Sequence, residues 1–370
     1  MALSKIDTTN MIEDVPQSKI DNNINFRSLV INGDMSQSQR STSVSSITSI
    51  GYYTVDRFQT LISSLGTWTQ SQSTTVPSGQ GFATSLKMDN TTADASPGSG
   101  DFCILRTKFE GQNLQYLKKG TSSAESLTLS FWVRSNKTGT YIAELYDSDN
   151  ARQNSQSYTI SSADTWEKKT ITYAGDTTGA FDNDNALSLS INFWLGAGTD
   201  FTSGTLSTSW SSVTSANRAV GQVNLADSTS NEWYITGVQL EAGQTASEFE
   251  FLPVDVNLKR CERYYQTLEF NNIVLIGNSF SAAEAVGINT FNKMRTAPTV
   301  TLPATGQSSG QISYITSAGN YPSTIGSHSA TPISNGSFRH RGQGYSGLTS
   351  TGVSWLYVNG ACSILLDAEL

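Results

Sequence analysis

Short alternating runs of apolar and polar residues dominate the chain between residues 127 and 240. In the run from Leu127 to Arg134, leucine, phenylalanine and valine take every second position, and polar residues or tryptophan take the positions between them. Because successive side chains of a β-strand point to opposite faces, this pattern predicts an antiparallel strand with one buried face. The same alternation predicts strands at 141–146, 158–160, 169–173, 187–195 and 233–240.

Two shorter apolar runs precede that region. Leu29 to Ile31 leads into Asn32-Gly33-Asp34, which is typical of a short strand that ends in a turn. Tyr52 to Phe58 is rich in aromatic and β-branched residues and predicts a second strand. Many short strands separated by polar turns are typical of a jelly-roll β-sandwich, which we expect to span residues 27–253.

The pattern changes after Pro253. From Val254 to Gln266 the apolar residues recur at helix-like spacing, which predicts one short linker helix. Further strands are expected at 272–276, 286–291, 299–302 and 354–366, the last of them around a turn at Asn359-Gly360. The chain is therefore expected to be all-β, with a smaller C-terminal β domain at 254–370.

Between these later strands, residues 307–352 are rich in glycine, serine and threonine. That composition predicts long exposed loops, and such loops are where β scaffolds usually place recognition.

Residues 1–26 are polar, with apolar residues at no steady period, so they cannot form a core. We expect this segment to become ordered against a partner. The residues expected to dock on that partner are Leu3, Ile6, Met11, Ile12 and Val15.

The N-terminus lacks both the positive region and the continuous apolar run of a secretory signal. No stretch elsewhere approaches the roughly 20 apolar residues of a membrane span, so no membrane insertion is expected.

Composition narrows the function further. Only 15% of the residues are charged, and the net charge is -8 with a pI near 4.9. Because phosphate binding needs clustered lysine and arginine, no nucleic acid partner is expected. The three cysteines, Cys103, Cys261 and Cys362, have no metal-binding spacing and are odd in number. We therefore expect buried thiols in a protein assembled in a reducing cytoplasm, without a disulfide framework.

The sequence offers little catalytic chemistry. Neither histidine has an acidic neighbour, and no Asp or Glu lies between Ser308 of a GxSxG string and His340, so a serine triad is not expected. Asp182 and Asp184 lie in an acidic, turn-like run and are expected to be solvated turn residues. The chain is therefore expected not to be an enzyme. A polysaccharide depolymerase that uses these two acids is the catalytic alternative.

Aromatic residues are the better lead to function. A sugar ring presents an apolar C–H face that stacks on indole rings, so Trp132, Trp166 and Trp194 are candidate glycan platforms. Trp132 and Trp194 lie opposite the apolar faces of their strands, so we expect them to face solvent or another subunit. Packing at a subunit interface or in the core is the competing interpretation.

Six segments, in this order, resemble a family of tail-fibre and virion appendage proteins of tailed bacteriophages. They are Leu29–Met35, Tyr53–Phe58, Trp233–Glu241, Cys261–Tyr265, Met294–Val300 and Asp367–Leu370. The resemblance implies a virion protein, often a homotrimer, whose N-terminal segment docks on a tail tube, an adaptor or a capsid. Its β domains would then attach to a glycan on the host cell surface. A capsid decoration or head-fibre protein with the same fold is the alternative.

The first domain also resembles jelly-roll carbohydrate-binding modules, in which an opening Asn-Gly-Asp strand lies beside the closing strand and the two flank a structural calcium. The resemblance implies Asp34 and Glu241 as calcium ligands. Gly237 departs from it, because such modules tend to have an acidic residue there. No other cofactor is expected.

Overall fold

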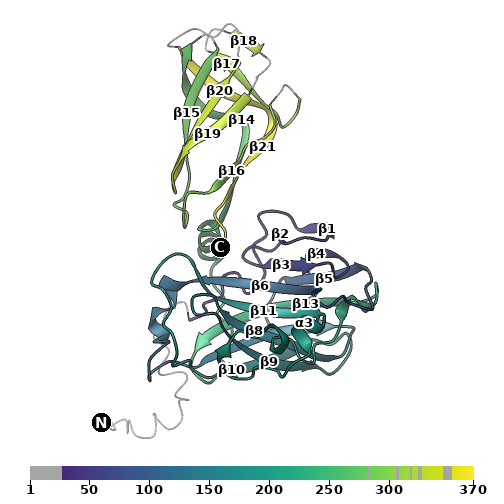
Figure 1. Cartoon of the computed structure of the whole chain (residues 1–370). Helices are drawn as coiled ribbons and strands as arrows, with labels where there is room; N and C mark the ends of the chain where they lie inside the picture. The colour runs from purple at the N-terminus through teal and green to yellow at the C-terminus, as the bar shows by residue number, and fades with distance from the viewer. Residues whose placement is uncertain (1–26, 282, 306–307, 317–318, 324–326, 345–351) are drawn as a thin grey trace, which may run out of the picture. The chain divides into compact units, whose positions relative to one another are not determined.

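The chain forms two compact units, Met1–Pro253 and Val254–Leu370 (Figure 1). This computed structural model describes residues 27–281, 283–305, 308–316, 319–323, 327–344 and 352–370. The expected docking residues Leu3, Ile6, Met11, Ile12 and Val15 lie outside the described residues. Among the residues described, no helix is both long enough and apolar enough to cross a membrane.

The first unit is a jelly-roll β-sandwich of two antiparallel sheets. The six-stranded sheet contains, in spatial order, β1 (Ser43–Ile47), β4 (Thr67–Ser73), β5 (Ser85–Thr92), β13 (Glu232–Ala242), β7 (Leu127–Ser135) and β10 (Glu167–Tyr173). The seven-stranded sheet contains β12 (Ser211–Ser212), β9 (Arg152–Ile160), β8 (Gly139–Asp147), β11 (Leu187–Ala197), β6 (Phe102–Glu110), β3 (Gln59–Ser63) and β2 (Gly51–Tyr52). The short helices are η1 (Gly111–Asn113), η2 (Gln115–Leu117), α3 (Thr199–Thr202), η3 (Ser215–Asn217) and η4 (Leu225–Asp227).

The core lies between the two sheets and confirms the alternation seen in the sequence. Leu129, Phe131 and Val133 of β7 and Ile191 and Phe193 of β11 are all fully buried in one apolar cluster. The rings of Phe131 and Phe193 meet edge to face at 5.2 Å across the sandwich. Each such side chain contributes about 1.5–3 kcal/mol by leaving water, so this cluster is the main source of the unit's stability.

The outer face of the seven-stranded sheet is covered as well. Trp194 of β11 is fully buried in a second cluster, with Ile104, Ile142 and Ala219. The covering segment, residues 198–224, includes α3 and η3. The expectation that Trp194 faces solvent or another subunit is therefore wrong. Alternation identified the correct face of the strand, but the segment that follows β11 folds back over this face and shields Trp194 from solvent.

Two early strands were predicted wrongly. Leu29 to Ile31 forms no regular strand, although its neighbourhood pairs with β13 through Leu29 N to Leu240 O and Val238 N to Gly33 O, both 2.9 Å. The opening segment therefore lies beside β13, as expected. Residues 53–58 form a turn between β2 and β3, closed by Phe58 N donating to Val55 O at 3.3 Å, and Arg57 takes φ 72°.

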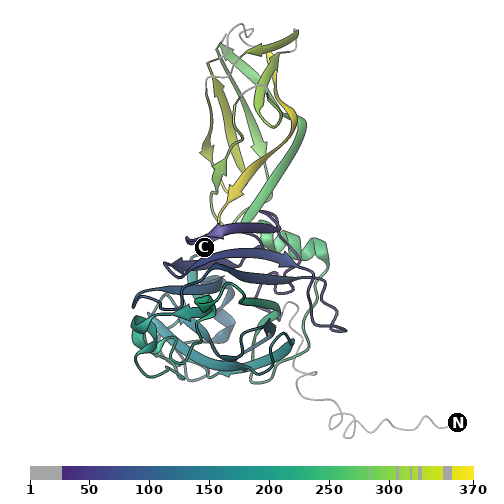
Figure 2. The ribbon, with the colours of Figure 1, turned by 90° about the vertical axis from the view of Figure 1, so that its right-hand side faces the viewer.

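The second unit begins with helix α4 (Val254–Glu262), which confirms the predicted linker helix. Its sheet contains, in spatial order, β18 (Gly319–Ser323), β17 (Ile312–Thr316), β21 (Val353–Asp367), β14 (Tyr265–Ser281), β15 (Glu284–Thr290), β20 (Ser337–Gln343) and β19 (Ser327–Ile333), and β16 (Thr299–Thr301) pairs with β21. The long strands β14 (green) and β21 (yellow) run the length of this unit (Figure 2). Its small apolar cluster includes Met294, Phe338 and Ile364.

Two expectations for this unit are corrected. Strand β21 passes through Asn359-Gly360 without a hairpin turn, and Gly360, at φ 86°, lies where the pairing of β14 with β21 shifts register. The segment 307–352, expected to form long loops, contains β17 to β20. Serine and threonine are compatible with paired strands, so composition alone did not reveal them. The three cysteines are buried, as expected, and none of them forms a disulfide bond.

Candidate functional site on the outer face of the seven-stranded sheet

A row of polar side chains crosses four strands on the outer face of the seven-stranded sheet. Gln59 of β3 pairs with Arg106 of β6, Arg106 pairs with Asn192 of β11, and Asn192 pairs with Glu144 of β8. Directly opposed residues on neighbouring strands have their Cβ atoms about 4.5–5.5 Å apart. Four strands that are distant in sequence therefore bring one continuous polar row together.

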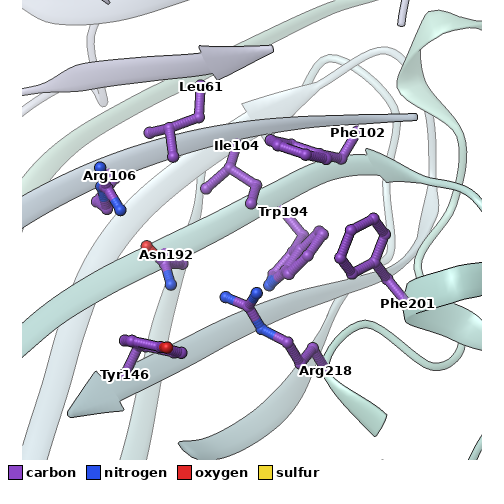
Figure 3. A pocket seen from close by; sticks show the side chains of 9 residues that line it. All are labelled: Leu61, Phe102, Ile104, Arg106, Tyr146, Asn192, Trp194, Phe201 and Arg218. Carbon is purple, nitrogen blue, oxygen red and sulfur yellow. The ribbon is translucent and has the colours of Figure 1, made fainter. Parts of the chain in front are cut away.

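A pocket of about 200 Å³ opens beside this row (Figure 3). We call it the Trp194 pocket, and its lining residues are Leu61, Phe102, Ile104, Arg106, Tyr146, Asn192, Trp194, Phe201 and Arg218. The pocket is smaller than the roughly 300–1,000 Å³ typical of sites for drug-sized ligands. It has room for a single small ring and its substituents.

A buried ion pair fixes one wall of the pocket. The Nε of Arg218 donates to Oε1 of Glu144 at 2.8 Å, and its Nη2 donates to Oε2 at 2.9 Å. The Glu144 side chain is fully buried and that of Arg218 is 17% exposed. Burial acts to lower the pKa of Arg218, but the charge and hydrogen bonds of Glu144 outweigh it and raise the pKa above its ordinary value. Arg218 therefore stays charged and its charge is compensated.

Aromatic rings hold the same guanidinium in place. The Arg218 Cζ lies 5.0 Å from the centroid of the Tyr146 ring and 5.1 Å from that of Trp194, and Figure 3 shows the guanidinium between the two rings. The Nε1 of Trp194 donates to Glu144 Oε2 at 3.2 Å, and Phe201 from the covering segment packs on the indole at 5.3 Å. Cation–π contacts and charged hydrogen bonds make this wall rigid.

Arg106, in contrast, has a neutral partner. Its Nε and Nη2 both donate to Oε1 of Gln59, at 3.2 and 2.7 Å. No carboxylate forms a salt bridge with Arg106 among the residues that the structure describes. Burial lowers the pKa of Arg106, and the positive charge of Arg218 lowers it further. The pocket therefore contains one cation whose charge has no counter-ion.

Asn192 presents an acceptor without a donor. Its Nδ2 donates to Glu144 Oε2 at 2.9 Å, and because a carboxylate only accepts, this bond fixes the orientation of the amide. The Oδ1 is buried and receives no hydrogen bond from any described residue. A buried acceptor without a donor costs about 1–3 kcal/mol. A ligand hydroxyl or a water molecule in the pocket would satisfy it.

No protein-family model and no curated protein matches the sequence. Solved structures that are similar to part of this chain include the enzymatically active domain of tailspike protein 4 from bacteriophage CBA120, at 16% identity and TM-score 0.31, over 59% of this chain and 22% of that one. TmCBM61 in complex with β-1,4-galactotriose matches at 10% identity and TM-score 0.29, over 58% and 99% of the two chains. A family 11 carbohydrate-binding module from Clostridium thermocellum, in complex with a mixed-linked tetrasaccharide, matches at 11% and 0.26, over 51% and 91%. At these values the likenesses do not identify a family, so the ligand is inferred from the pocket's own residues.

The other two candidate tryptophans lie elsewhere. Trp132, which is half-buried, lines a second pocket of about 290 Å³ on the six-stranded sheet, together with Phe82, Phe249 and Phe251. Trp166 is half-buried and packs edge to face on Tyr234, with ring centroids 6.1 Å apart. The three tryptophans therefore do not form one platform. That they bind glycan stays a prediction.

The backbone conformation and the packing at position 237 explain why glycine is found there. Gly237 adopts φ 62°, at the register shift between Thr236 and Gln239 where β13 pairs with β7. A Cβ atom there would lie 2.6 Å from Cζ of Phe82 and 3.2 Å from Cδ1 of Trp132. Glycine at this position therefore leaves room for the side chains that line the second pocket.

The expected calcium ligands are not neighbours. The backbone O of Asp34 accepts from Thr236 Oγ1 at 3.4 Å, and Glu241 lies five residues further along the same strand, roughly 16 Å at about 3.3 Å per residue. The carboxylate of Glu241 is occupied by Ser247 and Gln239. That Asp34 and Glu241 bind calcium therefore stays a prediction. Across the described part of the chain, no group of three or more His, Cys, Asp or Glu could hold a metal ion.

The acids considered for catalysis stabilise a turn. Asp184 and Asp182 are both exposed. Asp184 Oδ1 accepts from Ala186 N at 2.9 Å, and Asp149 Oδ2 accepts from Asp182 N at 2.9 Å. This arrangement agrees with solvated turn residues.

The sequence had no signal for Arg106, Asn192 or Arg218, because the residues they contact are distant in the sequence.

Proposed function

We propose that this chain binds a saccharide in the Trp194 pocket and does so as part of a bacteriophage virion appendage. The observation that supports binding is the combination of aromatic walls with polar atoms that lack protein partners, namely the outer N–H groups of Arg106 and the Oδ1 of Asn192. A sugar ring offers apolar C–H groups to the first and hydroxyl groups to the second.

The proposal is of binding without catalysis. The one carboxylate in the polar row, that of Glu144, accepts from Arg218, Asn192 and Trp194 and is fully buried. Its oxygens are therefore committed to structural hydrogen bonds and are not placed to transfer a proton to a substrate.

The virion part of the proposal is supported by the six ordered segments that resemble phage appendage proteins. In this proposal residues 1–26 dock the chain on the particle, and a homotrimer presents the β units to a host-surface glycan. A tail fibre is the preferred position, and a capsid decoration or head fibre is the alternative.

A glycan array followed by titration calorimetry tests binding. Tyr146→Ala should weaken binding of any glycan found on the array by about tenfold or more, because it removes an aromatic wall and a support of Arg218. The matched control is Tyr116→Ala, since Tyr116 is 41% exposed and does not line the pocket. Equal loss in both variants, or no glycan bound, would refute saccharide binding at this pocket.

Mass spectrometry of purified particles tests the virion role. The chain should be present at the low copy number of a tail appendage. A copy number that approaches that of the capsid protein would favour the decoration protein, and absence from the particles would refute the virion role.

A further inference from the structure

We propose that the Trp194 pocket selects an acidic saccharide and that Arg106 binds its carboxylate group. This inference rests on the proposed saccharide binding and adds the class of sugar.

The free hydrogen-bond donors of Arg106 have the geometry for a carboxylate. A guanidinium carries five N–H groups, and Gln59 uses the one on Nε and one on Nη2. The remaining donors are the two on Nη1 and the second on Nη2. One N–H of Nη1 and the remaining N–H of Nη2 form the outer fork of the guanidinium. Such a fork binds the two oxygens of a carboxylate through two parallel hydrogen bonds.

The charges in the pocket favour an anion. Two guanidinium groups, those of Arg106 and Arg218, line it, and Glu144 pairs with Arg218. One positive charge is left over, in a protein whose net charge is -8. Removing a cation from water is unfavourable, and burial is the main cause of the lowered pKa of Arg106, with the charge of Arg218 lowering it further and that of Glu144 acting against both. A neutral sugar would leave the charge of Arg106 uncompensated, whereas a carboxylate would compensate it.

Asn192 adds a second recognition point. It pairs directly with Arg106 across β11 and β6, and its buried Oδ1 receives no hydrogen bond from any described residue. The pair can bind one ring that carries a carboxylate and a neighbouring hydroxyl, with the carboxylate on Arg106 and the hydroxyl donating to Asn192. A uronic acid has this pattern. The volume of about 200 Å³ fits one such ring.

The test compares acidic oligosaccharides with neutral counterparts. The probes are oligosaccharides of galacturonate, glucuronate and mannuronate, each paired with its carboxyl-reduced form, which differs only in the charged group. Calorimetry should show at least one acidic probe bound about tenfold or more tightly than its reduced form. Its affinity should fall as NaCl rises.

Three variants of the full chain assign the effect to Arg106. Arg106→Gln should reduce the preference for the acidic probe to about twofold or less. Arg106→Lys keeps the charge but loses the fork, so its affinity should lie between those of the Gln variant and the wild type. Arg339→Gln removes an exposed arginine of the second unit and should bind like the wild type. Thermal melting confirms that each variant is folded, and the Lys variant carries the test if the Gln variant is not.

The outcomes separate the two proposals. Equal binding of acidic and reduced probes would overturn the acidic class and leave saccharide binding intact. Binding of neither would overturn both. A preference that survives Arg106→Gln, wild-type affinity in Arg106→Lys, or tighter binding of a sulfated oligosaccharide than of any uronate would each overturn the assignment of a carboxylate to Arg106.

Discussion

Removing the buried carboxylate of Glu144 should be among the most destabilising single changes in the first unit. Glu144→Leu leaves the guanidinium of Arg218, the Nδ2 of Asn192 and the Nε1 of Trp194 without their acceptor. Breaking a buried ion pair from one side costs about 3–5 kcal/mol, because the remaining charge is uncompensated. Total stabilities are about 5–15 kcal/mol, so the loss should be about a fifth of the total or more.

The double variant Glu144→Leu with Arg218→Met separates charge from packing. It removes the uncompensated guanidinium and should recover about 1–3 kcal/mol relative to Glu144→Leu alone. Recovery stays incomplete, because Asn192 and Trp194 still lack an acceptor. Glu125→Leu is the matched control, since Glu125 and its partner Lys118 are 38% and 53% exposed and the pair should contribute about 1 kcal/mol or less.

Urea unfolding followed by tryptophan fluorescence measures these differences, because six of the seven tryptophans lie in the first unit. A loss below about 1 kcal/mol for Glu144→Leu would refute the buried-pair reasoning. So would a double variant less stable than either single variant.

Two further predictions concern other parts of the chain. Burial and the neighbouring His328 lower the pKa of His340 to about 3, so between pH 6.5 and 3 the unfolded chain binds more protons than the folded one. The second unit should therefore lose up to about 1.4 kcal/mol of stability per pH unit as pH falls through this window, and its stability should be complete above the window. Hydrogen exchange of residues 327–343 should show the loss, and His340→Gln should reduce the dependence of stability on pH. Gly237→Ala should cost at least about 2 kcal/mol in urea unfolding, because its Cβ would meet Phe82, whereas Gly79→Ala, at φ 75° with no atom within 4 Å, should cost about 1. Similar costs for both glycines would show that backbone strain alone is responsible.

The sequence predicted the strands whose two faces differ in polarity. Strands β7, β11 and β13 were found because apolar residues alternate along them. Strand β6 was missed, because four apolar residues follow one another from Phe102 to Leu105 and the sequence shows no clean alternation. Periodicity reports only a difference in polarity between the two faces, so a strand with apolar residues on both faces is hard to recognise.

The candidate site was only half predictable for a related reason. Alternation placed Trp194 on the outer face, but its burial comes from Phe201 and Ala219 in the covering segment. Arg106 and Asn192 become one site through strand pairing, and Arg218 joins Glu144 from 74 residues away. A single sequence carries no local signal for such pairings, which tertiary structure alone creates.

The seven-stranded sheet forms the floor of the Trp194 pocket, and the covering segment forms part of its rim. Its two ends are tied to the sheet by Gly198 N to Asp101 O at 2.8 Å and Val223 N to Thr140 O at 2.9 Å. Between these ties it carries Arg218, while the sheet carries Arg106. Insertions or exchanges between residues 199 and 222 that keep Phe201, Arg218 and Ala219 can therefore reshape the rim without altering the floor. This makes the segment the natural target for randomised libraries aimed at changing the shape of the Trp194 pocket.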